Sequence, residues 1–263
     1  QANMATLRER GVHVVGPGSG YLACGDVDTG RMSEPEDIVE AICEVLNPAP
    51  QDLAGKRIVI TAGPTHEPID PVRFIGNRSS GKMGIALAGE AARRGAAVTL
   101  VLGPTSLDVP RSVECVRVQT AAEMLEAALN AFQTADVAIC AAAVADYTPA
   151  SPADHKLKKA NERLDHIELV ETVDILAELS RQKGERRVIG FAAETDNVVE
   201  YAERKLARKD CDAIIANDVS RADSGFGTDT NKAWIVSTMG TQELPVLTKS
   251  QLADIILDLL HNI

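Results

Sequence analysis

Aromatic side chains are scarce in this sequence, and basic side chains are outnumbered by acidic ones. One Trp, three Tyr and four Phe make up 3% of the 263 residues, and 27 Lys and Arg stand against 38 Asp and Glu, for a net charge of -11. Nucleic-acid binding uses a broad basic surface or aromatic side chains on which bases stack. The composition provides neither, so we expect no nucleic-acid partner.

The sequence also lacks a cysteine pattern and a long apolar run. Its five cysteines are widely spaced, with no C-x-x-C pair, which argues against a disulfide framework and a zinc site. The sequence contains no stretch of about 18 apolar residues, the length that a membrane-spanning helix needs. Its N-terminus also lacks the succession of basic, apolar and small residues that forms a secretory signal. We expect a cytoplasmic protein with reduced thiols and no membrane partner. Because the chain starts at Gln1 and not at a methionine, we also expect it to be part of a longer protein.

From Lys56 onward the sequence alternates regularly between apolar runs and helical patterns. The runs expected to form strands are residues 57–61, 97–102, 135–141, 187–192 and 212–216. The helical patterns that alternate with them are residues 83–94, 121–132, 173–181 and 198–209. Strands that are apolar on both faces and alternate with helices predict a three-layer α/β fold with a mostly parallel sheet between the helices.

The two ends of the chain depart from this pattern. After Asp229, runs at 232–237 and 242–247 predict an antiparallel hairpin that extends the sheet, followed by a closing helix at 249–260. The first segment predicts a strand, a glycine-rich loop and a helix, and then a linker broken by prolines. Their expected bounds are 12–15, 16–30, 34–46 and 47–51. This segment is too short to hold a core alone, so we expect two parts, residues 1–50 and residues 51–263.

A glycine-rich segment that follows the first long strand could bind an anion. Gly76-x4-Gly81-Lys82 matches the start of a phosphate-binding loop, but Met83 stands where a hydroxyl would hold magnesium. Glycines, the hydroxyls of Ser79 and Ser80 and a helix N-terminus would still form an anion site, whereas the alternative is a serine-capped helix start. We favour the anion site because further polar side chains crowd this segment. They are Arg73, Asn77, Arg78 and Lys82.

Cys140-Ala-Ala-Ala-Val-Ala-Asp146 ends another expected strand with small side chains. A planar ring could lie against them, with Asp146 bound to ribose hydroxyls or to a metal ion. The alternative is that the alanines only pack against a helix. Both interpretations stay open at this point.

Two groups of lysines could bind phosphate. Lys156-Leu-Lys-Lys159 is either a solvated face or part of the local cationic cluster that an acidic protein needs for a polyphosphate. Lys205 and Lys209 stand four residues apart in a helical pattern and repel each other unless an anion binds them. The alternative for this helix is that Glu200 pairs with Arg204 and the remaining charges are solvated.

Taken together, these motifs resemble those of phosphopantothenoylcysteine synthetase, from about Lys56 to the end of the chain. The segments that carry the resemblance are Ile58-Val-Ile-Thr-Ala-Gly-Pro-Thr-His-Glu-Pro-Ile-Asp70, Gly76-Asn-Arg-Ser-Ser-Gly-Lys-Met-Gly84, Ala142-Ala-Val-Ala-Asp146, Lys156-Leu-Lys-Lys159, Gly190-Phe-Ala-Ala-Glu-Thr195 and Ala216-Asn-Asp-Val219. The resemblance implies a Rossmann-like homodimer of coenzyme A biosynthesis that uses CTP and Mg²⁺. In that family the carboxylate of 4′-phosphopantothenate attacks the α-phosphorus of CTP, giving an acyl-cytidylate and pyrophosphate. The amine of L-cysteine then displaces CMP.

The resemblance also implies roles for individual residues. Asn77 and Lys156 are the implied catalytic residues, and Asn77 serves the attack by cysteine. The residues implied for phosphopantothenate are Arg73, Asn77, Ser79, Ser80 and Lys82. Those implied for the nucleotide are Cys140, Ala141, Ala142, Asp146, Lys156, Val173, Asp174, Ile175, Leu176, Phe191, Lys205 and Lys209. Val173 replaces a proline that is frequent in the family, and no metal ligand is assigned.

Residues 16–35 are similar to the last part of the flavin-dependent phosphopantothenoylcysteine decarboxylase, which commonly precedes the synthetase in bacterial proteins. The resemblance implies that residues 1–50 are a remnant of that domain and that Cys24 matches its catalytic acid. Asp28 stands at a usual glycine position, and the portions that bind flavin and carry the histidine are absent. We expect FMN only in an intact decarboxylase domain, and decarboxylation by the full-length protein but not by this chain alone.

Two alternative functions are weighed against the ligase. A dinucleotide-dependent oxidoreductase is disfavoured because no G-x-G-x-x-G follows the first long strand. A non-catalytic nucleotide-binding or dimerisation module would bind nucleotide without releasing pyrophosphate.

Overall fold

The computed structural model describes residues 2–21, 27–46, 48–158, 165–225 and 227–262. The chain divides into two compact units, Gln1–Pro50 and Gln51–Ile263. Within the described ranges, no helix combines the length and the apolar character that crossing a membrane requires.

The first unit consists of short elements and has no core of its own. Its elements are α1 (Ala2–Glu9), β1 (Gly18–Tyr21), β2 (Val27–Arg31) and α2 (Pro35–Leu46). β1 and β2 form an antiparallel hairpin, and α2 confirms the helix predicted at 34–46. None of the side chains that the structure describes before Leu53 is buried. The sequence predicts this lack of buried side chains, because so short a segment cannot hold a core alone.

The strand predicted at residues 12–15 is wrong, and the predicted loop at 16–30 contains the hairpin instead. The backbone N–H of Val12 donates to the Leu7 carbonyl at 3.0 Å, which turns the chain at the end of α1. Val12 and Val15 are 46% and 38% exposed. A short apolar run becomes a strand only where another strand pairs with it. In this unit the pairing is made by the backbone of the glycine-rich segment, whose side chains carry no strand signal.

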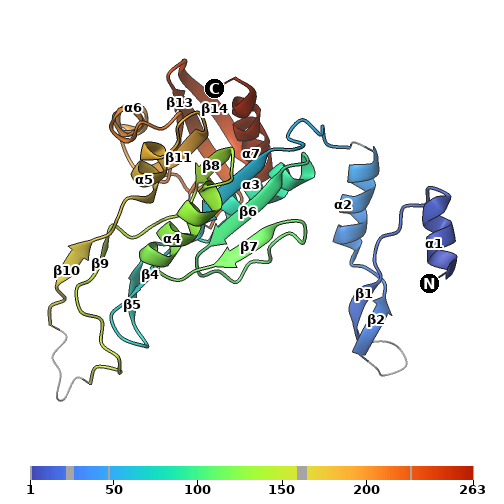
Figure 1. Ribbon diagram of the computed structural model, residues 1–263, viewed down its shortest axis with the longest axis horizontal. Coiled ribbons are helices and arrows are strands. Elements are labelled where there is room, and N and C mark those ends of the chain that lie inside the picture. Colours follow the sequence, from blue (N-terminus) through green and yellow to red (C-terminus); the bar gives the residue numbers. More distant parts are fainter. Residues whose placement is uncertain (1, 22–26, 47, 159–164, 226, 263) are drawn as a thin grey trace. The chain divides into compact units, whose positions relative to one another are not determined.

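The second unit is the predicted three-layer α/β fold. Its eight-stranded sheet has the order β14-β13-β12-β11-β8-β3-β6-β7 (Figure 1). The strands are β3 (Arg57–Ala62), β6 (Ala97–Leu102), β7 (Glu114–Arg117), β8 (Val137–Cys140), β11 (Arg187–Glu194), β12 (Ala213–Asp218), β13 (Thr230–Ser237) and β14 (Gly240–Thr248). From β12 to β7 neighbouring strands are parallel, whereas β13 and β14 are antiparallel. The five predicted strands and the hairpin are confirmed. The apolar pattern does not predict β7, because it is a short edge strand with charged residues at both ends.

Helices cover both faces of this sheet. They are α3 (Lys82–Arg93), α4 (Ala121–Phe132), α5 (Ile175–Arg181), α6 (Val198–Lys209), α7 (Lys249–Asp258) and the 3₁₀ turn η1 (Leu259–His261). Successive side chains of a strand point to opposite faces. Ile58 and Ile60 of β3 therefore pack with α3 and α7, while Val59 between them packs with α4 and α5. This alternation separates an α3–α7 layer from an α4–α5–α6 layer.

Two short strand pairs extend from the edge of the sheet and are called here the arm. β4 (His66–Pro68) pairs with β5 (Phe74–Gly76), and β9 (Tyr147–Pro149) pairs with β10 (Leu169–Glu171), both antiparallel. The two pairs contact each other through β4 and β9 and project away from the helical layers (Figure 1). The apolar pattern does not predict these strands, because three residues are too few for a periodicity to show.

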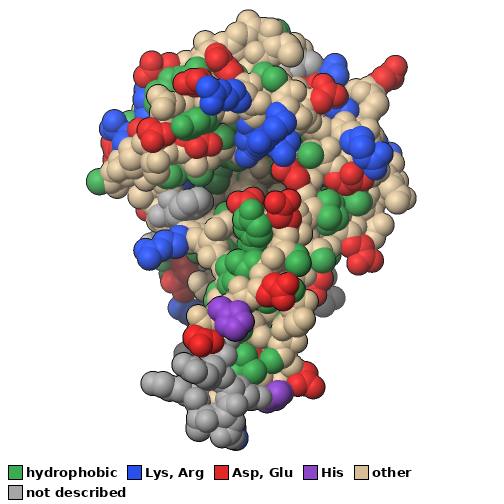
Figure 2. Space-filling view, turned by 90° about the vertical axis from the view of Figure 1, so that its left-hand side faces the viewer, with side chains coloured by type: hydrophobic (Ala, Val, Ile, Leu, Met, Phe, Trp, Pro, Cys, Tyr) green, Lys and Arg blue, Asp and Glu red, His purple; other side chains and the backbone are tan. Residues whose placement is uncertain are grey.

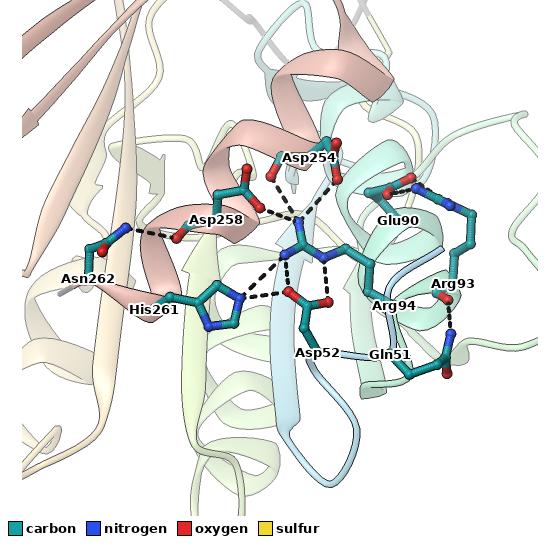
Figure 3. A network of polar contacts seen from close by, with 9 residues as sticks. All are labelled: Gln51, Asp52, Glu90, Arg93, Arg94, Asp254, Asp258, His261 and Asn262. Atoms are coloured by element: carbon teal, nitrogen blue, oxygen red, sulfur yellow. Dashed lines mark hydrogen bonds and ion pairs between the residues drawn. The ribbon is translucent and has the colours of Figure 1, made fainter. Parts of the chain in front are cut away.

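A buried arginine joins the start of the second unit to its last helix. The side chain of Arg94, which follows α3, is 2% exposed. It donates through Nε and Nη2 to Asp52, and through Nη1 to Asp254 at 3.1 Å and Asp258 at 2.8 Å (Figure 3). His261 Nε2 lies 2.6 Å from the Asp52 carboxylate. Hydrogen bonds from Arg94 and His261 hold the pKa of Asp52 well below its usual range. The network holds the carboxyl-terminal ends of α3 and α7 together.

We expect Asp52→Asn to lower the free energy of unfolding by about 2 kcal/mol, because it removes a charged partner from a buried guanidinium. The matched change Glu90→Gln breaks the more exposed pair with Arg93 on the same helix and costs less than about 1 kcal/mol. Since the pKa of Asp52 is depressed in the folded state, its stabilisation is present above the unfolded-state pKa of about 3.9 and is lost as the pH falls below it. Denaturant unfolding between neutral and acid pH measures both effects. Equal losses for the two variants would contradict this assignment.

Candidate active site

A cavity of about 830 Å³ opens where β3, β8, β11 and β12 end. In a parallel sheet the carboxyl ends of the strands meet at one edge, which is where α/β folds bind ligands. Residues from these ends, from the loop before α3 and from the starts of α5 and α7 line the cavity. Most of the residues predicted for the site lie in this one place.

The floor of the cavity is made of small side chains and strand backbone. Backbone amides of Ala141 and Ala143 donate to the carbonyls of Thr61 and Gly63 at 3.0 and 2.9 Å, which holds the alanine run against the end of β3. Burial raises the pKa of the Cys140 thiol to about 12, so this cysteine stays protonated and is a poor nucleophile. The floor therefore offers a flat surface for a planar ring and no covalent chemistry.

A cationic cluster from α6 lies beside this floor. Lys205 Nζ donates to the Phe191 carbonyl at 2.8 Å, and Lys209 forms an ion pair with Asp174. Asp174 caps α5 by accepting from the amide of Ala177 at 2.8 Å. Burial, the largest single effect, would raise the pKa of Asp174, but the hydrogen bonds from Lys209 and the Ala177 amide together with the charges of both lysines outweigh it and lower the net pKa. Asp174 is the only carboxylate among the described residues that forms an ion pair with this cluster, while the charge of Glu194 acts on Lys205 without an ion pair.

The predicted Glu200–Arg204 pair of α6 is confirmed, the prediction that its remaining charges are solvated is wrong for Lys205 and Lys209, and anion binding by these two lysines stays a prediction. Glu200 and Arg204 form an ion pair, with side chains that are 56% and 68% exposed. Lys205 and Lys209, which lie on a neighbouring face of the helix, line the cavity instead. Burial lowers the pKa of Lys205, so its charged form costs more free energy than it would in water. A bound anion would offset that cost.

The loop before α3 forms the other wall. The Nδ2 group of Asn77 donates to the carbonyls of Ala143 and Val144 at 3.3 and 3.0 Å, so its amide oxygen remains available as an acceptor. Gly81, the residue before α3, has φ of +82°, which favours glycine. A Cβ on Gly84 would lie 2.3 Å from the Cβ of Ala62. Only glycine lets the first turn of α3 pack this closely on the end of β3.

Some predicted residues lie in the cavity and others do not. The lining includes Asn77, Ser79, Ser80, Lys82, Cys140, Ala141, Ala142, Asp146, Val173, Asp174, Ile175, Leu176, Phe191, Lys205 and Lys209. Arg73 and Lys156 do not line it. Arg73 instead pairs with Asp70 and donates to the Leu157 carbonyl at 2.9 Å, which holds the two segments of the arm together. Lys156 is exposed beside Leu157, and Cys24 and Lys159 lie outside the described residues.

The cavity is also lined by Asn217, Asn231 and Lys249, for which the sequence predicts no role. Thr248 and Gln251 form a capping box that starts α7 at Lys249. A helix N-terminus disfavours a cation in its first turn. A lysine in that position is therefore locally unfavourable, and this feature of the sequence could have indicated a functional role for Lys249.

A family model and known proteins similar to this chain point to one family. A model of the DNA/pantothenate metabolism flavoprotein C-terminal domain matches residues 53–263. The "Coenzyme A biosynthesis bifunctional protein CoaBC" of Bacillus subtilis is 48% identical over 250 residues, which cover 94% of this chain and 61% of that protein. The protein of the same name from Escherichia coli strain K12 is 48% identical over 262 residues, with coverages of 98% and 64%. The chain thus spans about three fifths of the length of these relatives.

A solved structure shows the same fold. The crystal structure of the C-terminal domain of CoaBC is 46% identical and covers 80% of this chain and 96% of its own, with a TM-score of 0.68.

Proposed function

The chain belongs to the family of the DNA/pantothenate metabolism flavoprotein C-terminal domain, and from this premise we propose that its second unit is a ligase of coenzyme A biosynthesis. The proposed reaction joins 4′-phosphopantothenate to L-cysteine with CTP as the activating nucleotide. Family membership confirms the resemblance read from the sequence. The observation that carries the proposal is the single cavity in which the lysine cluster of α6 and the Asn77 loop stand on either side of the alanine floor.

The first half of the proposed reaction activates a carboxylate. The carboxylate of phosphopantothenate attacks the α-phosphorus of CTP, the bond to the β-phosphate breaks, and pyrophosphate leaves with the electron pair. Both reactants are anions, so the site must offset negative charge as the two approach. Lys205 and Lys209 provide positive charge at the nucleotide, and the small floor lets a base lie close to the backbone. This step needs no protein nucleophile, in agreement with the protonated Cys140.

The second half forms the amide bond. The amine of cysteine attacks the acyl carbonyl of the acyl-cytidylate, and CMP leaves with the electrons of the broken bond to oxygen. The amide oxygen of Asn77 can accept a hydrogen bond from that amine, because the nitrogen of the same side chain is already held by two carbonyls. Asn77 would orient the nucleophile. Lys156 stays a predicted catalytic residue on the exposed part of the arm.

Magnesium fits this site as a metal shared with the triphosphate. Among the described residues, no group of three His, Cys, Asp or Glu side chains gathers as a metal site. Mg²⁺ commonly uses one or two carboxylates together with substrate phosphates. Asp146 is an exposed carboxylate of the cavity lining and would hold the ion. Bound magnesium would supply charge neutralisation of the departing pyrophosphate.

The arm supports the proposal of a homodimer. Phe74, Leu169 and Val170 are 52%, 43% and 46% exposed, and Figure 2 shows hydrophobic side chains gathered on the face that the arm presents. Leu169 and Val170 follow each other in β10 and point to opposite faces, and exposed apolar side chains that gather on a surface are typical of a protein–protein interface. Decarboxylation by a longer protein, with FMN, stays a prediction from the resemblance of residues 1–50.

The proposed activation step is tested by pyrophosphate release from CTP, 4′-phosphopantothenate and magnesium without cysteine, with ATP as a parallel arm. We expect release with CTP, and CMP and amide on adding cysteine. Lys205→Met should lower kcat/KM for CTP by about 30-fold, the loss of one charge-assisted hydrogen bond of about 2 kcal/mol. Arg204→Met, on the solvated face of the same helix, should stay within about twofold. A folded wild type that binds nucleotide but releases no pyrophosphate would select the binding module instead.

For Asn77→Ala we expect pyrophosphate release to persist better than amide formation, because the side chain acts on the amine in the second step. Both rates are measured in one reaction mixture, so each serves as the reference for the other. Equal loss of the two rates would refute a role confined to the second step.

The dimer is tested with a matched pair of surface changes. Val170→Asp on the arm should weaken self-association at least tenfold, or about 1.4 kcal/mol, because it places a charge within the apolar patch. Val246→Asp is the control, since Val246 is 42% exposed on β14, outside the arm. Sedimentation velocity over a range of protein concentrations measures the effect. Unchanged association of the Val170 variant would place the interface elsewhere.

A further inference from the structure

β4 belongs to a motif that carries the family resemblance, residues 58–70, but the proposed reaction gives this strand no role. None of its three residues lines the cavity. Thr65, immediately before β4, and Glu67 within it are 0% and 2% exposed. A buried carboxylate costs free energy that an apolar side chain at the same place would not cost. Glu67 therefore needs a physical reason other than filling the core.

The buried face of this segment makes two directional hydrogen bonds. Thr65 and Glu67 are two residues apart, so their side chains point to the same face of an extended chain. Thr65 Oγ1 accepts from the amide of Ala145 in the alanine run at 2.9 Å. Glu67 Oε1 accepts from the amide of Ala121 at 2.8 Å. These bonds hold the segment to two different parts of the fold, and they fix its position more narrowly than apolar packing would.

The partner of Glu67 is the start of a helix that is itself held rigidly. Ala121 is the first residue of α4, and the first amides of a helix have no partner within it. A carboxylate at this end also lies favourably in the field of the helix dipole. α4 packs on the sheet through side chains that are at most 1% exposed, namely Met124, Ala128 and Phe132. Glu67 thus ties β4 to a fixed point of the α4–α5–α6 layer.

β4 in turn sets the place of Asn77. Glu67 pairs with Ile75 of β5, and β5 ends at Gly76, the residue before Asn77. A Cβ on Gly76 would lie 2.8 Å from the carbonyl oxygen of Thr65, so the two strands approach closely at this point. A displacement of β4 is therefore passed directly to Asn77.

We propose that Glu67 is a positioning residue for the amide-forming step. By anchoring the β4–β5 hairpin to the first amide of α4, it fixes the place from which Asn77 presents its amide oxygen to the amine of cysteine. Glu67 contacts no substrate in this proposal and acts only through Asn77. The inference rests on the proposed function and extends it to a residue outside the cavity. A misplacement of about 1 Å in an orienting group can lower a rate by about 100-fold.

The test uses Glu67→Ala, Glu67→Gln and the control Glu123→Ala. Glutamine keeps an oxygen that can accept from the Ala121 amide, whereas alanine removes the acceptor. Glu123 lies at the same helix start and accepts from the amides of Gln119 and Thr120. Glu123→Ala therefore weakens the start of α4 without releasing the hairpin, and the unfolding temperatures of the two alanine variants allow loss of stability to be separated from loss of position.

We expect Glu67→Ala to lower the ratio of amide formation to pyrophosphate release by about tenfold or more, and Glu67→Gln to recover most of it. Glu123→Ala should keep the wild-type ratio within about twofold. In an Asn77→Ala background, Glu67→Ala should lower the ratio no further, because the residue through which it acts is absent. An unchanged ratio in Glu67→Ala, or an equal further loss in the Asn77→Ala background, would overturn the proposal.

A second readout needs no turnover. Amide hydrogen exchange of the β4–β5 hairpin, residues 66–76, should be faster in Glu67→Ala than in wild type, Glu67→Gln or Glu123→Ala, because only that variant frees the hairpin from α4. Equal exchange in the two alanine variants would overturn the anchoring. A folded wild type that releases no pyrophosphate would overturn the ligase assignment instead, and the exchange rates would then decide by themselves whether Glu67 anchors the hairpin.

Discussion

The functional groups of the cavity depend on the parallel pairing of β3, β8, β11 and β12. Parallel strands end at one edge, and each end continues into a loop or a helix start. Residues more than a hundred positions apart in the sequence, such as Asn77 and Asn217, reach the same cavity for this reason. Two contacts with the end of β3 then hold the floor and one wall of the cavity in place. The backbone of the alanine run forms hydrogen bonds with it, and Gly84 lets α3 pack closely on the same strand. With an antiparallel order, these loops would leave the sheet at opposite edges.

Charge is distributed so that an acidic protein presents local positive regions. Many basic side chains of the second unit form ion pairs, as with Arg94 among three aspartates and Arg204 with Glu200. At the cavity fewer ion pairs form: Asp174 pairs with Lys209, and among the described residues no carboxylate forms an ion pair with Lys205 or Lys249. Uncompensated buried charge costs stability in the empty protein. Under the proposed function, bound phosphate would offset that cost, and ligand affinity and stability would be coupled.

The Arg94 network and the cavity act at opposite ends of the same helix pair. Arg94 ties the carboxyl-terminal ends of α3 and α7 together, while Lys82 and Lys249 at their amino-terminal ends line the cavity. The helices therefore run side by side in the same direction, and their positive ends add at the ligand. His261 and Asp52 complete this network and do not line the cavity (Figure 3). A structural ion-pair network thus positions a binding surface that it does not touch.

The α/β class, the five predicted strands, the main helices and about half of the residues that line the cavity follow from the sequence, because buried strands and amphipathic helices leave strong periodic patterns and the motifs have a specific order. Four features depend on contacts between residues distant in the sequence. The short strands of the arm carry too few residues for a pattern, and the expected strand at 12–15 failed because strand formation depends on a partner elsewhere in the chain. Lys249 lies at the cavity because α7 packs beside α3. Arg73 lies outside it because Asp70 and the Leu157 carbonyl bind its guanidinium. Local sequence sets which elements form, whereas contacts between distant residues decide which side chains meet.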